Sequence, residues 1–146
     1  MNKENDEAEI VLKRFAKYAK IPVINMESAT GHPLQALADA LTLKEHKTKY
    51  RPKVVLTWAP HPKALPHAVA NSFSKMMSFQ EADYFISNPE GYDLDKRITK
   101  NIPVIHNQSE ALQNADFVYA KNWCSYERYG QTLRTDNEWM ITKEKM

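Results

Sequence analysis

Glycine and cysteine are both scarce in this sequence. With three glycines in 146 residues, neither of the glycine-rich phosphate-binding patterns, GxGxxG or GxxxxGK[ST], occurs. The single cysteine, Cys124, cannot form an internal disulfide, and no Cys/His spacing is typical of a zinc site. His61 and His67 lie six residues apart in a proline-rich segment, and we interpret them as loop or cap histidines. We therefore expect neither a metal nor a cofactor.

Long apolar runs, a strong net charge and a targeting segment are missing as well. The longest apolar runs are short, such as VVL at 54–56, so we expect no membrane-spanning segment. The formal net charge is only +2, and no basic block alternates with aromatic residues, which argues against nucleic-acid binding. The polar, acidic start MNKENDEAE is unlike a signal or transit peptide. Together with the single cysteine, these features favour a cytoplasmic protein.

The sequence contains 42% hydrophobic and 26% charged residues, which are ordinary values for a soluble globular domain with a hydrophobic core. From residue 53 onward, short apolar segments alternate with helical patterns. This alternation predicts an α/β fold, with a parallel sheet, right-handed crossovers and helices on both faces. We predict helices at 65–77, 93–101 and 109–115, the last capped by Ser109. The predicted strands are 53–59, 83–88, 102–106 and 116–122.

The first 50 residues predict a separate arrangement. Asp6 suits a helix cap with Glu9 as its reciprocal partner, and the segment IPVINM at 21–26 reads as a short buried strand. A second helix begins near His32 or Pro33, since proline suits a first helical turn. A lone parallel strand cannot satisfy its backbone groups, so we expect 21–26 to lie apart from the four later strands. The apolar faces of the two helices are Val11, Phe15 and Tyr18, and Leu34, Leu37, Ala38 and Leu41.

Polar residues gather where the predicted strands end, at 27–35, 59–63, 88–92 and 121–131. Ligands of open parallel sheets bind beyond the carboxyl ends of the strands, so this edge is a candidate binding face. Each group also has a plain structural interpretation. Ser28, Thr30 and His32 could cap a helix, Asn71 could be a surface helix residue, and Lys121 could pair with a nearby carboxylate. Residue types and spacing alone do not name a ligand.

Particular segments are more specific. ESATGHPLQALAD at 27–39 resembles the His-Pro-x-Gln segment of the carbamoyltransferases. Three further segments resemble one branch of that family, the N-acylornithine carbamoyltransferases, and are most similar to its N-succinylornithine enzymes. They are VVLTWAPHPKALPHAVANSF, NPEGYDLD and ADFVYAKNWCSYERYGQ, and the resemblance runs from about Glu7 to Met146.

The resemblance implies a fold as well as an activity. It implies a homotrimer of two-domain subunits when full length, with carbamoyl phosphate bound mainly by the first domain and the amino acid by the second. Residues 1–31 would be a remnant of the carbamoyl phosphate domain, and 32–50 a connecting helix and linker. Residues 51–146 would form an incomplete, Rossmann-like ornithine-binding domain. The implied reaction transfers a carbamoyl group from carbamoyl phosphate to the δ-amino group of an N-acylated ornithine, in arginine biosynthesis.

The same resemblance assigns roles to individual residues. His32 and Gln35 would bind carbamoyl phosphate and stabilise the negative charge that develops on its carbonyl oxygen. They are three residues apart on a first helical turn, so they can converge on one atom. Glu27, Asn71 and Lys121 would bind the acylated amino acid, and His61 lies at the edge of the same face.

The sequence also departs from the family pattern. Gly31 stands where arginine is usual in this branch, and losing that fixed cation weakens phosphate handling or local anchoring. The Ser-x-x-Thr-Arg phosphate-binding segment and the His-Cys-Leu-Pro segment are both absent from these 146 residues. We therefore expect the isolated chain to have little or no transferase activity.

Three alternatives remain beside an acylornithine carbamoyltransferase. One is an inactive fragment that serves only as a structural or oligomer-contact piece. Another is a carbamoyltransferase for plain ornithine, which the YAKNW segment at 119–123 disfavours by resemblance. The third is a dinucleotide-binding domain, against which the proline-rich, glycine-free turn at 57–66 argues. Succinyl is favoured over acetyl only by resemblance, and the sequence does not say whether the chain is a natural truncation.

Overall fold

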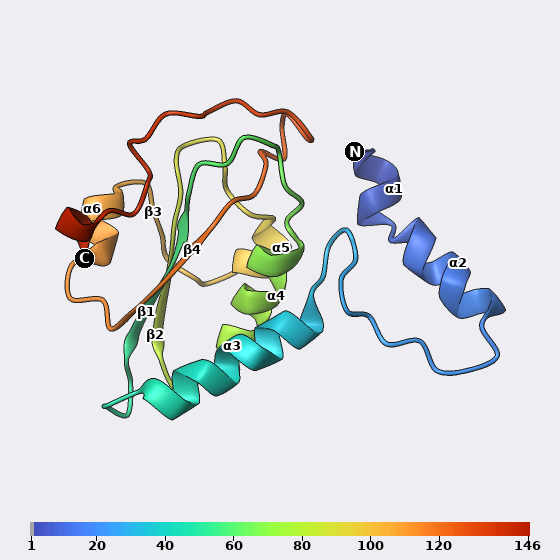
Figure 1. Cartoon of the computed structure of the whole chain (residues 1–146), viewed down its shortest axis with the longest axis horizontal. Coiled ribbons are helices and arrows are strands. Elements are labelled where there is room, and N and C mark those ends of the chain that lie inside the picture. The colour runs from blue at the N-terminus through green and yellow to red at the C-terminus, as the bar shows by residue number, and fades with distance from the viewer. Residues whose placement is uncertain (1) are drawn as a thin grey trace.

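Four parallel strands form the centre of the fold in the computed structural model, which describes residues 2–146 (Figure 1). β1 (Lys53–Trp58) is central and pairs with β2 (Asp83–Ser87) on one side and β4 (Phe117–Lys121) on the other. With β3 (Val104–Ile105) beside β2, the strand order is β3-β2-β1-β4. The fold class and all four predicted strands are confirmed, and β1 is buried along almost its whole length, as its continuous apolar run predicted.

Helices cover both faces of this sheet (Figure 1). On one face lie α3 (Pro33–His46) and α4 (Ala68–Met77), and α5 (Lys96–Thr99) packs beside α4. On the other face lies α6 (Gln108–Leu112). The main core lies between the sheet and α4, and it includes Val54, Leu56, Trp58, Phe73, Ile86 and Trp123. A short 3-10 helix, η1 (Lys143–Lys145), follows the tail that crosses the sheet edge.

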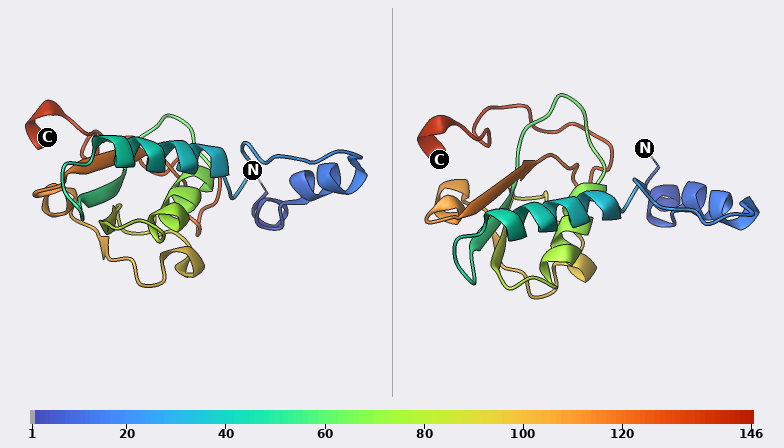
Figure 2. Two further views of the ribbon diagram at one scale, coloured as in Figure 1. Left: turned by 90° about the horizontal axis from the view of Figure 1, so that it is seen from below. Right: turned by 60° about the horizontal axis from the view of Figure 1, so that its bottom comes forward.

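The N-terminal arm, residues 2–31, extends away from the sheet in every view (Figures 1 and 2). It contains α1 (Lys3–Glu7) and α2 (Ile10–Tyr18). The predicted strand at 21–26 is wrong, because these residues form no strand, and Ile21 and Ile24 are 76% and 73% exposed. A parallel strand needs a neighbour to take its backbone hydrogen bonds, and 21–26 has none among the described residues. The segment does lie apart from the main sheet, as predicted.

Two predicted helix caps are also wrong. Asn2, and not Asp6, caps the first helix, and the chain breaks at Glu9, whose backbone is left-handed with φ 53°. Two short helices therefore replace the single predicted one. The Glu9 carboxylate accepts hydrogen bonds from Ser28 and Thr30 instead of capping a helix. At α6 the cap is Asn107, whose side chain accepts from the Glu110 N–H, so Ser109 lies inside the helix.

The predicted apolar face of α3 is not the buried one. Ala36 and Ala40 are buried, whereas Leu37 and Leu41 are more than half exposed. α3 packs along α4, and small residues let two helix backbones approach closely, so alanine and not leucine occupies this contact. None of the helices in residues 2–146 is long and apolar enough to cross a membrane.

Candidate functional site

The polar segment at 27–32 is fixed from one side by Glu9. The Glu9 carboxylate accepts hydrogen bonds from the Ser28 hydroxyl at 2.8 Å and from the Thr30 N–H and hydroxyl at 2.8 and 2.5 Å. Burial by itself would raise the pKa of Glu9, but the hydrogen bonds from Thr30 and Ser28 outweigh it and hold the pKa below its usual value. Glu9 therefore acts as an anionic anchor that shapes this turn.

From the other side, the same segment is tied to the first turn of α4. Asn71 Nδ2 donates to the Thr30 carbonyl at 3.3 Å, and the His32 N–H donates to Ser72 Oγ at 2.8 Å. Asn71 is only 3% exposed, so it is not the surface residue of the plain interpretation. Ser72 was missed by sequence reasoning, and its place beside Asn71 in the VANS segment was the available signal.

Glu27 and His32 approach each other across this turn. His32 Nε2 lies 3.9 Å from Glu27 Oε2, with the histidine side chain 23% and the glutamate side chain 59% exposed. His32 Nδ1 is buried and has no hydrogen-bond partner among the described residues. A carboxylate, an imidazole and, through Thr30, the Asn71 amide thus gather on one short segment, which can hold an amine and a polarised carbonyl.

The other predicted residues are less closely joined. Gln35 Nε2 donates to Asp39 Oδ1 at 2.8 Å, so its convergence with His32 on one atom remains a prediction. Lys121 ends β4 at the same sheet edge, but no hydrogen bond or ion pair in residues 2–146 joins its side chain to Asn71, and it does not line the pocket beside Asn71. His61 lies on the exposed loop after β1, where its Nδ1 accepts from the Lys63 N–H at 3.1 Å.

The loop after β4 adds an aromatic layer that sequence reasoning missed. His67 is buried, its Nε2 lies 2.6 Å from the Cys124 carbonyl, and its ring stacks on Tyr126 at 3.9 Å. Burial raises the pKa of Tyr126, and the nearby Asn71 amide opposes the shift. Tyr129 donates to Asp6 Oδ2 at 3.0 Å, which joins the loop to the N-terminal arm. No local sequence pattern marks these contacts, because they join residues more than 50 positions apart.

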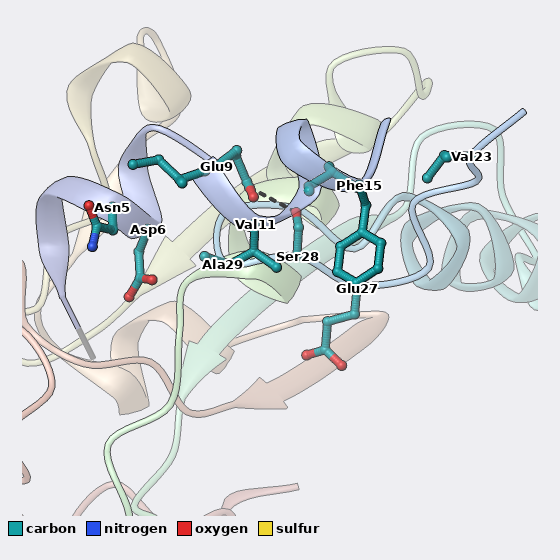
Figure 3. A pocket seen from close by; sticks show the side chains of 11 residues that line it. Asn5, Asp6, Glu9, Val11, Phe15, Val23, Glu27, Ser28 and Ala29 are labelled. Atoms are coloured by element: carbon teal, nitrogen blue, oxygen red, sulfur yellow. Dashed lines mark hydrogen bonds between the residues drawn. The ribbon is translucent and has the colours of Figure 1, made fainter. Parts of the chain in front are cut away.

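Two pockets flank the segment at 27–32. A pocket of about 440 Å³ lies between α2 and residues 23–29, with mostly apolar lining and Glu27, Glu9 and Asp6 as its acidic members (Figure 3). A more polar pocket of about 310 Å³ lies beside Asn71. In the part of the chain that the structure describes, no group of three His, Cys, Asp or Glu residues could hold a metal ion.

Known proteins similar to this chain are carbamoyltransferases. The profile of the family "Aspartate/ornithine carbamoyltransferase, carbamoyl-P binding domain" matches residues 3–45. The N-succinylornithine carbamoyltransferase of Bacteroides fragilis (strain 638R) is 46% identical over 147 residues, which is 99% of this chain and 46% of that protein. The N-acetylornithine carbamoyltransferase of Xanthomonas axonopodis pv. citri (strain 306) is 40% identical over 86% of this chain and 40% of its own length.

Solved structures of similar proteins agree with these matches. Acetylornithine transcarbamylase complexed with acetylcitrulline superposes with a TM-score of 0.79 at 40% identity, over 88% of this chain and 43% of that one. A mutant of N-acetyl-L-ornithine transcarbamylase, complexed with carbamyl phosphate and N-succinyl-L-norvaline, gives a TM-score of 0.79 at 39% identity over 89% of this chain and 43% of that one. This chain thus spans less than half the length of these relatives. Its similar relatives are N-succinylornithine and N-acetylornithine carbamoyltransferases, and its residues 3–45 match the carbamoyl phosphate-binding domain of the aspartate/ornithine carbamoyltransferases.

Proposed function

We propose that this chain supplies part of the active site of an N-acylornithine carbamoyltransferase. The reaction transfers a carbamoyl group from carbamoyl phosphate to the δ-amino group of an N-acylated ornithine, with succinyl favoured over acetyl, in arginine biosynthesis. The observation that carries the proposal is the turn that bears Glu27 and His32, which Asn71 and Ser72 of α4 bind on one side and Glu9 binds on the other. The names of the relatives at 46% and 40% identity support the same reaction.

The chemistry assigns a role to each group. As the neutral δ-amine attacks the carbamoyl carbon, a C–N bond forms, the C–O bond to phosphate breaks, and the amine passes a proton to the departing phosphate. His32 donates to the carbonyl oxygen, where negative charge develops, and Gln35 joins it once its amide leaves Asp39. Glu27, 3.9 Å from His32, accepts from the incoming amine and orients it.

The sheet edge holds the rest of the substrate in this proposal. Asn71 contributes a buried amide, Lys121 an ammonium for a carboxylate, and His61 a donor at the margin of the loop after β1. The full-length protein is a cytoplasmic homotrimer in this proposal. Plain ornithine as the substrate, and a purely structural role for the chain, are the competing functions.

A chimera tests the proposed reaction. The aligned segment of the Bacteroides fragilis relative is replaced by this chain, and a second chimera is built in the Xanthomonas relative. We expect both to form N-acylcitrulline from carbamoyl phosphate, and neither to use plain ornithine efficiently. N-succinylornithine turnover in the Xanthomonas chimera would support the succinyl preference of this chain.

Two controls complete that experiment. His32→Ala in either chimera should lower kcat, since it removes a donor to the developing oxyanion. The isolated 146-residue chain should show little or no turnover, because it lacks the Ser-x-x-Thr-Arg segment. Chimeras that carbamoylate only plain ornithine, or that fold and carbamoylate nothing, would contradict the proposal.

A further inference from the structure

Two tyrosines of the loop after β4 are fixed to the sheet domain by stacking. The rings of Tyr126 and Tyr129 both stack on the ring of His67, with ring centroids 3.9 and 5.7 Å away. His67 is buried, and its Nε2 lies 2.6 Å from the Cys124 carbonyl. Cys124 donates its own N–H to the Leu65 carbonyl at 2.9 Å. The loop therefore presents two aromatic side chains whose positions are set by the core.

Helix α1 of the N-terminal arm binds these two tyrosines. The Tyr129 hydroxyl donates to Asp6 Oδ2 at 3.0 Å, and Lys3 Nζ donates to the Tyr126 carbonyl at 2.9 Å. Lys3 Nζ also lies 5.6 Å from the centroid of the Tyr126 ring, which is a cation–π distance. The two hydrogen bonds involve a carboxylate and an ammonium, so both are charge-assisted. We call this set of interactions the α1 contact.

The rest of the arm adds little packing that could hold it against the sheet domain. No residue of α1 or α2 is buried, and the arm extends away from the sheet in both further views (Figure 2). A segment with few buried contacts opens locally at a small cost in free energy. The α1 contact therefore decides whether α1 and α2 stay docked on the loop after β4.

Docking of α1 also encloses the pocket of about 310 Å³ beside Asn71. Glu7 of α1 and Tyr126 of the loop both line this pocket, so one of its walls exists only while α1 is in place. The Asn71 side chain is 3% exposed. Polar interactions are stronger in an enclosed site than in water, because the local dielectric is lower. The α1 contact therefore sets how strongly this pocket can hold a polar ligand.

The turn that bears Glu27 and His32 has anchors of its own. The His32 N–H donates to Ser72 Oγ at 2.8 Å, and Asn71 Nδ2 donates to the Thr30 carbonyl at 3.3 Å. Both anchors come from α4 and neither involves α1. Loss of the α1 contact should therefore open the pocket and leave the two side chains assigned to the reaction close to their places.

We propose that Tyr129 and Lys3 are positioning residues, which dock α1 on the loop after β4 and so enclose the pocket beside Asn71; this inference rests on the function proposed above. Neither residue touches the reacting atoms. Each acts through α1, whose Glu7 covers the pocket. Release of α1 lets water enter, and the amino acid substrate then binds more weakly although the side chains that take part in the reaction are unchanged.

Three variants test the α1 contact. Tyr129→Phe removes one hydroxyl and keeps the ring that stacks on His67. Asp6→Ala removes the acceptor of that hydroxyl. Tyr18→Phe is the matched control, because the Tyr18 side chain is 75% exposed and makes no hydrogen bond within residues 2–146. Backbone ¹⁵N relaxation of the 146-residue chain measures whether α2 tumbles with the sheet domain, and steady-state kinetics of the Bacteroides chimera measure KM and kcat.

We expect α2 to tumble with the sheet domain in the unaltered chain and in Tyr18→Phe, and to tumble faster in Tyr129→Phe and Asp6→Ala. Tyr129→Phe should raise the KM for N-succinylornithine at least about fivefold, as for a lost charge-assisted hydrogen bond. It should change kcat less than about twofold, which separates it from His32→Ala. The double variant Asp6→Ala/Tyr129→Phe should resemble Asp6→Ala alone, because both substitutions break the same hydrogen bond.

Other results would overturn this inference. These are equal tumbling of α2 in all variants, the same KM in Tyr129→Phe and Tyr18→Phe, or a loss of kcat at constant KM. Failure of the proposed reaction gives a different pattern, since the unaltered chimeras would then form no N-acylcitrulline. The relaxation measurement needs no substrate, so in that case faster tumbling of α2 in Tyr129→Phe would still support the docking of α1, and unchanged tumbling would still contradict it.

Discussion

At the scale of a single residue, the titration of His67 makes the stability of the fold depend on pH. Burial lowers its pKa to about 4, and the hydrogen bond to the Cys124 carbonyl only partly offsets that shift. In the unfolded chain the pKa is about 6.5, so the unfolded state binds more protons between these values. The contribution of His67 to stability is therefore present above about pH 6.5 and is lost as the pH falls toward 4.

We expect the free energy of unfolding to fall by about 2 kcal/mol between pH 7.5 and pH 5 because of this histidine. His67→Gln keeps a donor for the Cys124 carbonyl and does not titrate. Urea denaturation at both pH values should show less than half of the wild-type change in that variant. An identical pH dependence in the two proteins would mean that other groups cause it.

Gly31 is a second residue with a testable consequence. Its backbone does not lie in the left-handed region, and an added Cβ would meet Ser28 Oγ, Asn25 Nδ2 and Ser72 Oγ at 3.6–3.7 Å, which are ordinary contacts. Gly31→Ala should therefore stabilise the chain by about 0.4–1 kcal/mol, through a less flexible unfolded state. Chemical denaturation measures this, and a destabilised variant would show that the turn at 28–31 needs glycine.

Residue-scale prediction from the sequence reached only part of the site. Resemblance selected Glu27, His32 and Asn71; the structure places Glu27 and His32 near each other on one turn, and Asn71 of α4 donates to that turn. Ser72 and Tyr126 were not predicted, because their roles depend on contacts with residues 40 or more positions away. Periodicity and caps report local conformation, and they carry no information about such pairs.

At the scale of elements, the four strands were predictable and the N-terminal arm was not. Buried strands such as β1 show a continuous apolar run, whichever neighbours they have. In α2 the same reasoning found an apolar face, but none of its residues is buried, and Phe15 is 70% exposed. A pattern indicates which face is apolar, and only the tertiary structure shows whether anything covers it.

This difference in burial predicts that a Phe→Ala substitution lowers the free energy of unfolding much more at Phe73 than at Phe15. Phe73→Ala, in the core of α4, should lower the free energy of unfolding by about 3 kcal/mol or more, because it leaves a cavity against Tyr84 and Tyr119. Phe15→Ala, on α2, should change it by less than about 0.5 kcal/mol. Equal losses in urea denaturation would mean that α2 is packed in the folded chain.

At the scale of the whole molecule, the N-terminal arm and the sheet domain meet at the candidate site. Asp6 accepts from Tyr129, and Lys3 donates to the Tyr126 carbonyl at 2.9 Å, while within the arm Glu9 accepts from Thr30. Segments at the two ends of the chain therefore fix the turn that carries Glu27 and His32. In the proposed enzyme this turn and the edge of the sheet form two walls of one substrate site.

The most direct measurement of that central claim is the steady-state kinetics of Lys121→Met in the Bacteroides chimera. Lys121 lies on the sheet wall, at the end of β4, and is assigned to the acylated amino acid. Its loss should raise the KM for N-succinylornithine at least about tenfold and change the KM for carbamoyl phosphate little. An unchanged KM for N-succinylornithine, or an equal rise for both substrates, would contradict the two-walled acylornithine site.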